Sequence, residues 1–154
     1  MSLKTWMDEF YPMQAESVAF NPLKATKQDD LKMLQHARLK WTGLKPENLK
    51  KHGCYKNYPK SIVDDDDNHS FSIAWDTCAL CITYMHENPS IVMGERCEGC
   101  PLKVVRGMPC DIGTTSYNPY KMFVDLGDPE PMLDLIDQAI ARIKDQQPSK
   151  ATPA

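Results

Sequence analysis

The clearest helical pattern in the chain lies between Thr26 and Gly43. Apolar side chains recur there at the three- and four-residue spacing of one helix face, namely Leu31, Leu34, Ala37 and Trp41. Thr26 with Asp29 three residues later is typical of an N-terminal cap. The pattern therefore predicts a helix from Thr26 to Gly43, with its apolar face directed to a core.

Weaker helical patterns with recognisable ends occur in four more places. They predict a short helix between Pro46 and Gly53, a helix over 79–87, another between Asn118 and Gly127, and a last one that starts at Asp128. The last helix has an apolar face formed by Met132, Ile136, Ala139, Ile140 and Ile143. Most of the chain is therefore expected to be helical.

One segment has the alternating pattern of a strand. Phe71, Ile73 and Trp75 alternate with smaller residues, and the segment leads directly to Cys78. We expect an α+β fold: a mostly helical small domain with a short sheet and a zinc-knuckle-like site. The predicted organisation is a single domain over 1–154, with an irregular N-terminal arm (1–25), a globular core (26–145, metal site at 78–110) and a flexible tail (146–154).

Composition narrows the class of protein. The 154 residues are 42% hydrophobic and 25% charged, which is ordinary for a globular domain. The formal charge of -3 gives no global attraction to nucleic acid or anionic lipid. No apolar run is long enough to cross a bilayer, and the N-terminal residues do not have the basic stretch and apolar segment that are typical of a secretory leader. We therefore expect a cytoplasmic protein without a membrane partner.

The cysteines carry the strongest chemical signal. Cys78/Cys81 and Cys97/Cys100 form two C-x2-C pairs with fifteen residues between them, and Cys110 follows. In a reducing compartment such pairs are typical of a four-thiolate metal site, with one zinc ion as the preferred occupant. An iron–sulfur cluster uses the same ligands and is the second choice. Which four of the five cysteines bind stays open, because the chain after Gly107 could fold Cys110 back onto the site.

Catalytic alternatives fit the sequence less well. His86 and Glu87 are adjacent and Arg96 precedes Cys97, whereas zinc deaminases need H-x-E and then P-C-x-x-C. A redox dithiol at either pair is the minority interpretation, and Cys54 is interpreted as a core thiol. We therefore predict no catalytic residue and no cofactor other than the metal, with zinc in a structural role.

A basic segment supplies the alternative function. Between Lys45 and Lys60, lysines alternate with tyrosines, and the candidate contacts are Lys50, Lys51, Tyr55, Lys56, Tyr58 and Lys60. Lysines could contact phosphates and tyrosines could stack on bases, which would make the chain a zinc-knuckle nucleic-acid-binding protein. A solvated lysine-rich surface is the simpler interpretation. Four consecutive carboxylates follow at 64–67, and we expect them in an exposed loop.

The cysteine arrangement resembles that of small phage-encoded and prophage-encoded proteins. Shared features are Cys78-Ala79-Leu80-Cys81, then Cys97-Glu98-Gly99-Cys100-Pro101-Leu102, then Cys110, together with the segments at 10–12, 40–49 and 128–131. The resemblance implies a phage origin, a cysteine-bound metal and the host cytoplasm, and it supplies no reaction. Our leading expectation is an interaction or adaptor factor that acts on a host or phage protein, in an unspecified oligomeric state.

Overall fold

The computed structural model describes residues 1–57, 60–66, 69–85, 97–110, 113 and 118–146. Within them it is mostly helical with one small sheet, so the general α+β prediction is confirmed. The helices are α1 Leu3–Phe10, α2 Ala15–Val18, α3 Lys27–Gly43, α4 Pro46–Lys51, α5 Ala79–Met85, α6 Pro101–Arg106, α7 Pro119–Leu126 and α8 Glu130–Gln146, with a 3-10 turn η1 at Trp75–Thr77. The strands are β1 Tyr55–Asn57, β2 Ser61–Val63 and β3 Ser70–Ser72.

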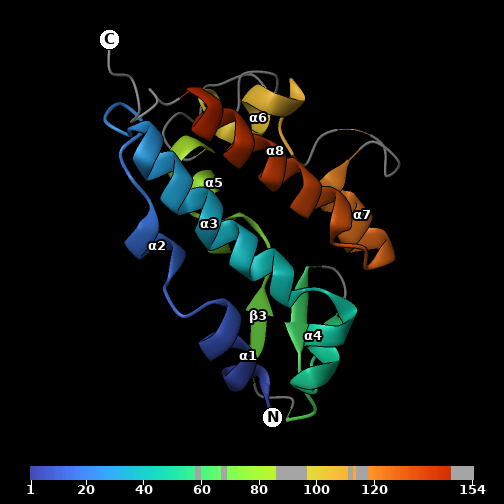
Figure 1. Ribbon diagram of the computed structural model, residues 1–154. Coiled ribbons are helices and arrows are strands. Elements are labelled where there is room, and N and C mark those ends of the chain that lie inside the picture. The colour runs from blue at the N-terminus through green and yellow to red at the C-terminus, as the bar shows by residue number, and fades with distance from the viewer. Residues whose placement is uncertain (58–59, 67–68, 86–96, 111–112, 114–117, 147–154) are drawn as a thin grey trace, which may run out of the picture.

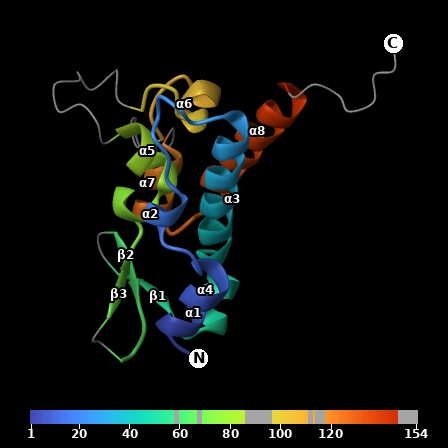
Figure 2. The same cartoon turned by 90° about the vertical axis from the view of Figure 1, so that its left-hand side faces the viewer.

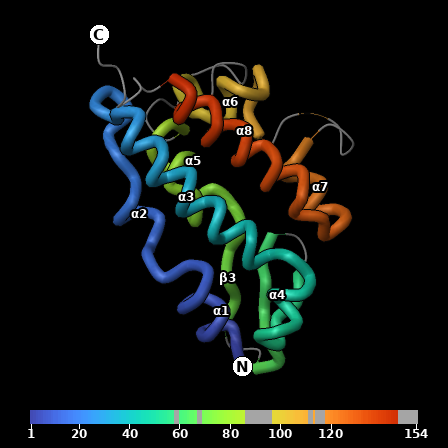
Figure 3. The backbone as a smooth tube through the Cα atoms, in the orientation of Figure 1, coloured from blue at the N-terminus to red at the C-terminus, as the bar shows by residue number. Residues whose placement is uncertain are grey.

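The two long helices α3 and α8 form the centre of the molecule. They lie against each other (Figures 1 and 2), and Arg38 Nε donates to Asp137 Oδ1 across them at 2.6 Å. At one end of α3 lie α1, α4 and the sheet, and at the other lie α5 and α6 (Figure 3). α5 packs on α3 whereas α6 packs on α8, so α5 and α6 are supported by different long helices.

Four of the predicted helices form where expected. Thr26 caps α3 by accepting the Asp29 N–H, and the Asn118 side chain caps α7 in the same way. α4 begins at Pro46, and α8 begins at Glu130, two residues after the predicted start. α5 ends at Met85 within the described residues, so the expectations for 86–87 and for the tail over 147–154 lie outside them.

The predicted irregular arm over 1–25 is wrong, because it contains α1 and α2. The Ser2 side chain accepts the Thr5 N–H and completes a capping box, which starts α1. Leu3, Trp6 and Phe10 then fall on one face and are buried. Pro12 lies just beyond the helix and does not interrupt it. The helix is only two turns long, so its period was hidden among other aromatic residues.

The sheet is antiparallel in the order β1-β2-β3. Ile62 of β2 pairs with Phe71 of β3, and both are buried on the face that meets α1. The predicted strand is confirmed around Phe71 but is shorter than expected, because Trp75 begins η1 and is 46% exposed. Within the described residues no helix has the length and apolar character that a membrane crossing requires.

An aromatic cluster fixes α1 to α3. Trp6 contacts the rings of Phe10 and Phe71, and its indole N–H donates to the Gly43 carbonyl oxygen at 2.7 Å. A Cβ at Gly43 would lie 2.4 Å from Phe10 Cγ, which is a severe overlap. The close approach of α1 to the end of α3 therefore requires glycine at this position.

Asp64 is the exception in the acidic segment. It is buried, whereas Asp65 and Asp66 are exposed, so the prediction of an exposed loop is wrong at Asp64. Its Oδ2 accepts the Leu3 N–H at 2.6 Å, and its Oδ1 accepts the Asp66 N–H. The bond from Leu3 lowers the pKa of Asp64 from its ordinary value of 3.8. This carboxylate joins the β2–β3 connection to the start of α1.

Replacing Asp64 by Asn should make stability less dependent on acid. The pKa of Asp64 is lower in the folded chain than in the unfolded chain. The ionised Asp64 therefore stabilises the fold at pH values above its ordinary pKa, and this stabilisation is lost as the pH falls through the lowered pKa of the folded state. Urea unfolding should therefore show Asp64→Asn less stable than the native chain at neutral pH, with the difference shrinking in acid. Asp65→Asn removes the same charge from an exposed position and is the control. A difference that stays constant across pH would contradict this role.

Candidate metal centre

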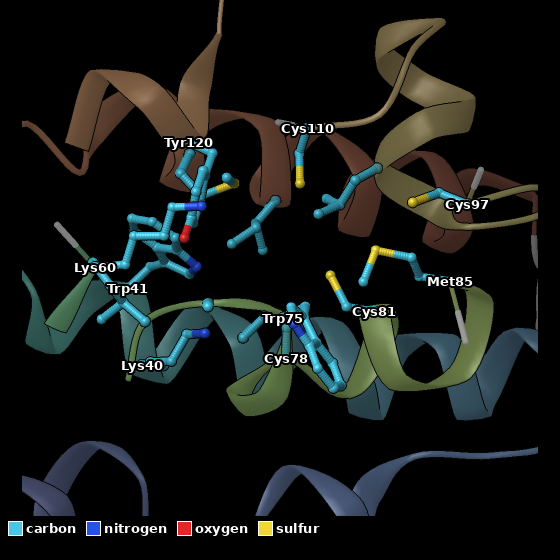
Figure 4. Close-up of a pocket in the computed structure, with 16 residues that line it drawn as sticks. Lys40, Trp41, Lys60, Trp75, Cys78, Cys81, Met85, Cys97, Cys110 and Tyr120 are labelled. Atoms are coloured by element: carbon cyan, nitrogen blue, oxygen red, sulfur yellow. The ribbon is translucent and has the colours of Figure 1, made fainter. Parts of the chain in front are cut away.

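A cavity of about 470 Å³ lies between α3, α5, the start of α6 and α8. Four of the predicted ligands line it, namely Cys78, Cys81, Cys97 and Cys110. Figure 4 shows Cys110 opposite Cys81, with Cys97 at one end, and these three side chains come from different elements. The rest of the wall is largely apolar and aromatic and includes Trp41, Ile73, Leu102, Tyr120 and Ile136. The chain therefore brings cysteines distant in sequence to one cavity that is partly open to solvent.

The first cysteine pair is placed by the turn from η1 into α5. Cys78 immediately precedes α5, and its sulfur accepts the backbone N–H groups of Leu80 and Cys81. A hydrogen bond from the Cys81 thiol lowers the pKa of Cys78, assisted by the charge of Lys40, while the same contact raises the pKa of Cys81. This environment favours a thiolate at Cys78, the form that binds metals.

The second pair lies in a tight turn before α6. The Cys100 N–H donates to the Cys97 carbonyl oxygen at 2.9 Å, and Gly99 has φ +84°, as expected for a knuckle. Cys97 itself has φ +65°, which is uncommon for a residue with a side chain. Such conformations are concentrated at functional sites, where the surrounding structure holds them. The turn orients Cys97 toward the cavity at a cost in backbone energy.

Cys100 lies beside the other cysteines. It is buried and close enough to Cys78 and Cys97 to interact with them electrostatically. Burial raises the pKa of Cys100 to about 12, although the Leu102 and Lys103 N–H groups that bond its sulfur oppose this shift. A free thiol would therefore stay protonated at this position, and deprotonation would require a bound cation.

The loop after α6 returns Cys110 to the site. Gly107 has φ +84° and ends α6, which reverses the chain. The Tyr120 N–H then bonds the Cys110 carbonyl oxygen at 3.4 Å and connects this loop to α7. The expected folding back of Cys110 is therefore seen, and all five candidate cysteines lie in one region. Which four would bind a metal remains open.

Lys40 is a part of the site that the sequence interpretation missed. Its side chain is 1% exposed, and its Nζ donates to the Thr77 carbonyl oxygen at 3.0 Å and the Thr77 hydroxyl at 3.3 Å. Burial lowers the pKa of Lys40, while negative charge on Cys78, Cys81, Cys110 and Asp76 acts in the opposite direction.

Met33, Ala37 and Lys40 are spaced so that they lie on one buried face of α3. This spacing is the sequence signal that could have identified Lys40 as a buried residue. A buried ammonium is costly unless anionic groups lie beside it. Lys40 therefore suits a cavity whose occupant is negatively charged.

The structure does not show a preformed site for one ion within the described residues. Among the described residues, no three His, Cys, Asp or Glu side chains stand together as a ready ligand set for one ion. The zinc assignment and the ligation by cysteine therefore stay predictions.

The basic segment is divided between several elements. Lys45 pairs with Glu130 at 3.6 Å, and Lys51 pairs with Glu9 at 2.9 Å, so two of its charges are partly neutralised. Lys50 is exposed on α4.

The rest of that segment lies on β1 and beyond it. Tyr55 is exposed, Lys56 is half-buried, and the Lys60 Nζ lies 5.7 Å from the centre of the Tyr120 ring at the cavity wall. Tyr58 lies outside the described residues. The nucleic-acid interpretation stays a prediction.

A second polar cluster contains a buried histidine. His52 Nδ1 lies 2.8 Å from the Thr5 hydroxyl, and its Nε2 lies 2.7 Å from Glu9 Oε2. The Thr5 hydroxyl also takes part in the capping box of α1, which makes this cluster an anchor between α1 and α4. Cys54 is buried nearby and burial raises its pKa to about 11, so its prediction as a core thiol is confirmed.

Comparison of the chain with models of known protein families, with curated proteins and with solved structures found no match. The resemblance to phage-encoded cysteine proteins therefore stays a prediction, and the site must be interpreted from its own chemistry.

Proposed function

We propose that the chain is a metal-binding protein that holds its centre through cysteine thiolates in the cavity described above. The observation that carries the proposal is that Cys78, Cys81, Cys97 and Cys110 line one cavity beside the buried ammonium of Lys40. Thiolates bound to a metal carry net negative charge, so the lysine and the centre stabilise each other.

The proposed role of the centre is structural. Cys78 and Cys81 belong to the α5 region, which packs on α3, whereas Cys97 and Cys100 precede α6, which packs on α8. A metal bound by both pairs would crosslink these two parts of the fold. The broader proposal, an adaptor that contacts a host or phage protein, rests on the sequence resemblance. The nucleic-acid-binding role is kept as its alternative.

Native mass spectrometry and metal analysis of the purified full chain test the proposal. The native mass should exceed the chain mass by a bound metal centre, and acid denaturation should release it. Iodoacetamide should label the four ligating cysteines only after denaturation with chelator, so that four of the five site cysteines are protected in the native chain. The variant Cys54→Ala removes a buried thiol outside the cavity and should bind metal as the native chain does. Recovery of only metal-free chain, or of cystine bridges among the site cysteines, would disprove the proposal.

A further inference from the structure

We infer that the occupant of the cavity is an iron–sulfur cluster held by four thiolates, an inference that rests on the proposed function and goes beyond it. The starting observation is the size of the cavity that four of the cysteines line together with aromatic and aliphatic side chains. The cavity measures about 470 Å³ and has cysteines on several sides (Figure 4). A water molecule occupies about 30 Å³ of liquid, so this space is much larger than a single ion needs.

The geometry of a zinc site leaves no such space. Each sulfur lies about 2.3 Å from the ion, which places the four sulfurs about 3.8 Å from one another in a tetrahedron. A single zinc would therefore require four site sulfurs to converge on one point, whereas among the described residues no three possible ligand side chains stand together. In a cluster each thiolate binds a different iron of the core or shares an iron with one partner, so the thiolates surround an inorganic core and stay apart.

The surroundings of the sulfurs suit a cluster. Cys78 accepts two backbone N–H groups, from Leu80 and Cys81, and Cys100 accepts two, from Leu102 and Lys103. N–H bonds to ligating sulfurs and burial are the factors by which proteins set a cluster's reduction potential. The largely apolar wall of this partly open cavity adds to the effect.

Lys40 completes the charge arrangement. Its ammonium is buried at the cavity wall, and its hydrogen bonds are to the neutral carbonyl and hydroxyl oxygens of Thr77. A thiolate-ligated cluster has net negative charge spread over core and ligands. A fixed cation beside it stabilises that charge and favours the reduced, more negative form.

The test begins with full-length chain prepared without oxygen. One portion is reconstituted with ferrous iron, sulfide and dithiothreitol, and a second portion receives zinc alone. Iron, acid-labile sulfide and zinc are quantified, and Mössbauer spectra are recorded. We expect iron and sulfide in equal amounts, with spectra of coupled irons, in the native chain and in Cys54→Ala. The double variant Cys78→Ser/Cys81→Ser should lose the iron and the sulfide.

The outcomes separate the two proposals. A first portion without bound sulfide, together with stoichiometric zinc in the second portion and in chain isolated from cells, would overturn the cluster and leave the metal-binding proposal standing. Chain that binds neither iron nor zinc, or that isolates with a Cys78–Cys81 disulfide, would overturn both proposals. Iron that binds without sulfide would also overturn the cluster.

Lys40 variants then test where the cluster lies. Lys40→Met should lower the midpoint potential for one-electron reduction by dithionite, because a nearby positive charge is lost, and Lys40→Arg should keep it close to the native value. Lys27→Met removes a surface lysine on the same helix and should leave the potential unchanged. If Lys40→Met folds poorly, Lys40→Arg still tests the role of the charge, because it keeps the positive charge and should keep the native midpoint potential. Equal potentials in Lys40→Met and the native chain would exclude this cavity as the cluster site.

Discussion

Replacing Cys97 and Cys100 together by serine is expected to empty the metal centre and to destabilise the fold around α6. Both residues lie in the knuckle before α6, and serine is a poor substitute for thiolate toward a soft metal site. Metal contributes roughly 10 kcal/mol or more to peptides that fold only with zinc. This chain buries an apolar core of its own, so we expect a smaller loss, of about several kcal/mol in the free energy of unfolding.

Hydrogen exchange should locate this effect. Amides of α6 and of the turn over 97–100 should exchange faster in the double variant, whereas those of α1 and the sheet should keep their protection. Cys54→Ala is the matched control, since it also removes a buried thiol but leaves the cavity unchanged. A variant that retains its metal and its exchange pattern would show that the knuckle is not part of the centre.

Replacing Trp6 by alanine should lower the free energy of unfolding by about 3–5 kcal/mol, the range for a large buried aromatic residue. Trp6 is 0% exposed and packs between Phe10 and Phe71. Its loss would also leave the Gly43 carbonyl oxygen without its indole donor. Urea unfolding followed by circular dichroism measures this change, because α1 should separate from the end of α3.

Gly43→Ala provides an independent test of the same contact. Alanine favours a helix more than glycine does by up to about 1 kcal/mol, but the added Cβ would overlap Phe10. We therefore expect net destabilisation. Leu23→Ala changes a side chain that is 90% exposed and should shift stability by no more than about 0.5 kcal/mol. A Trp6→Ala variant as stable as Leu23→Ala would contradict the assignment of α1 to the core.

Local signals made the longer helices predictable. The Thr26 cap and the apolar spacing after it located α3, and Asn118 with Gly127 bounded α7, because caps and periodicity depend on neighbouring residues alone. β1 and β2 have three residues each, too few for an alternating pattern, and β1 lies within the lysine-rich segment. Their pairing depends on Phe71 and on α1, which the local sequence does not show.

The cysteines of the site could be predicted from the sequence, whereas the contribution of Lys40 and the aromatic wall could not. C-x2-C spacing pointed to 78, 81, 97 and 100, and the structure brings these sulfurs and Cys110 into one region. The contribution of Lys40 depends on the packing of α3 against α5, and the aromatic wall depends on the position of α7. These are tertiary contacts. For the same reason the size of the cavity that the cysteines line, which bears on the choice of metal, cannot be inferred from their spacing in the sequence.

The burial of Lys40 has an evolutionary consequence. In the proposed centre, thiolate sulfurs beside the lysine would offset the cost of burying its charge, and the lysine would in turn stabilise the thiolates. If the site cysteines were lost in evolution, the Lys40 ammonium would stay buried without the negative charge of the thiolates beside it. We therefore expect the lysine and the cysteines to be gained and lost together among descendants of this chain, as a single heritable unit.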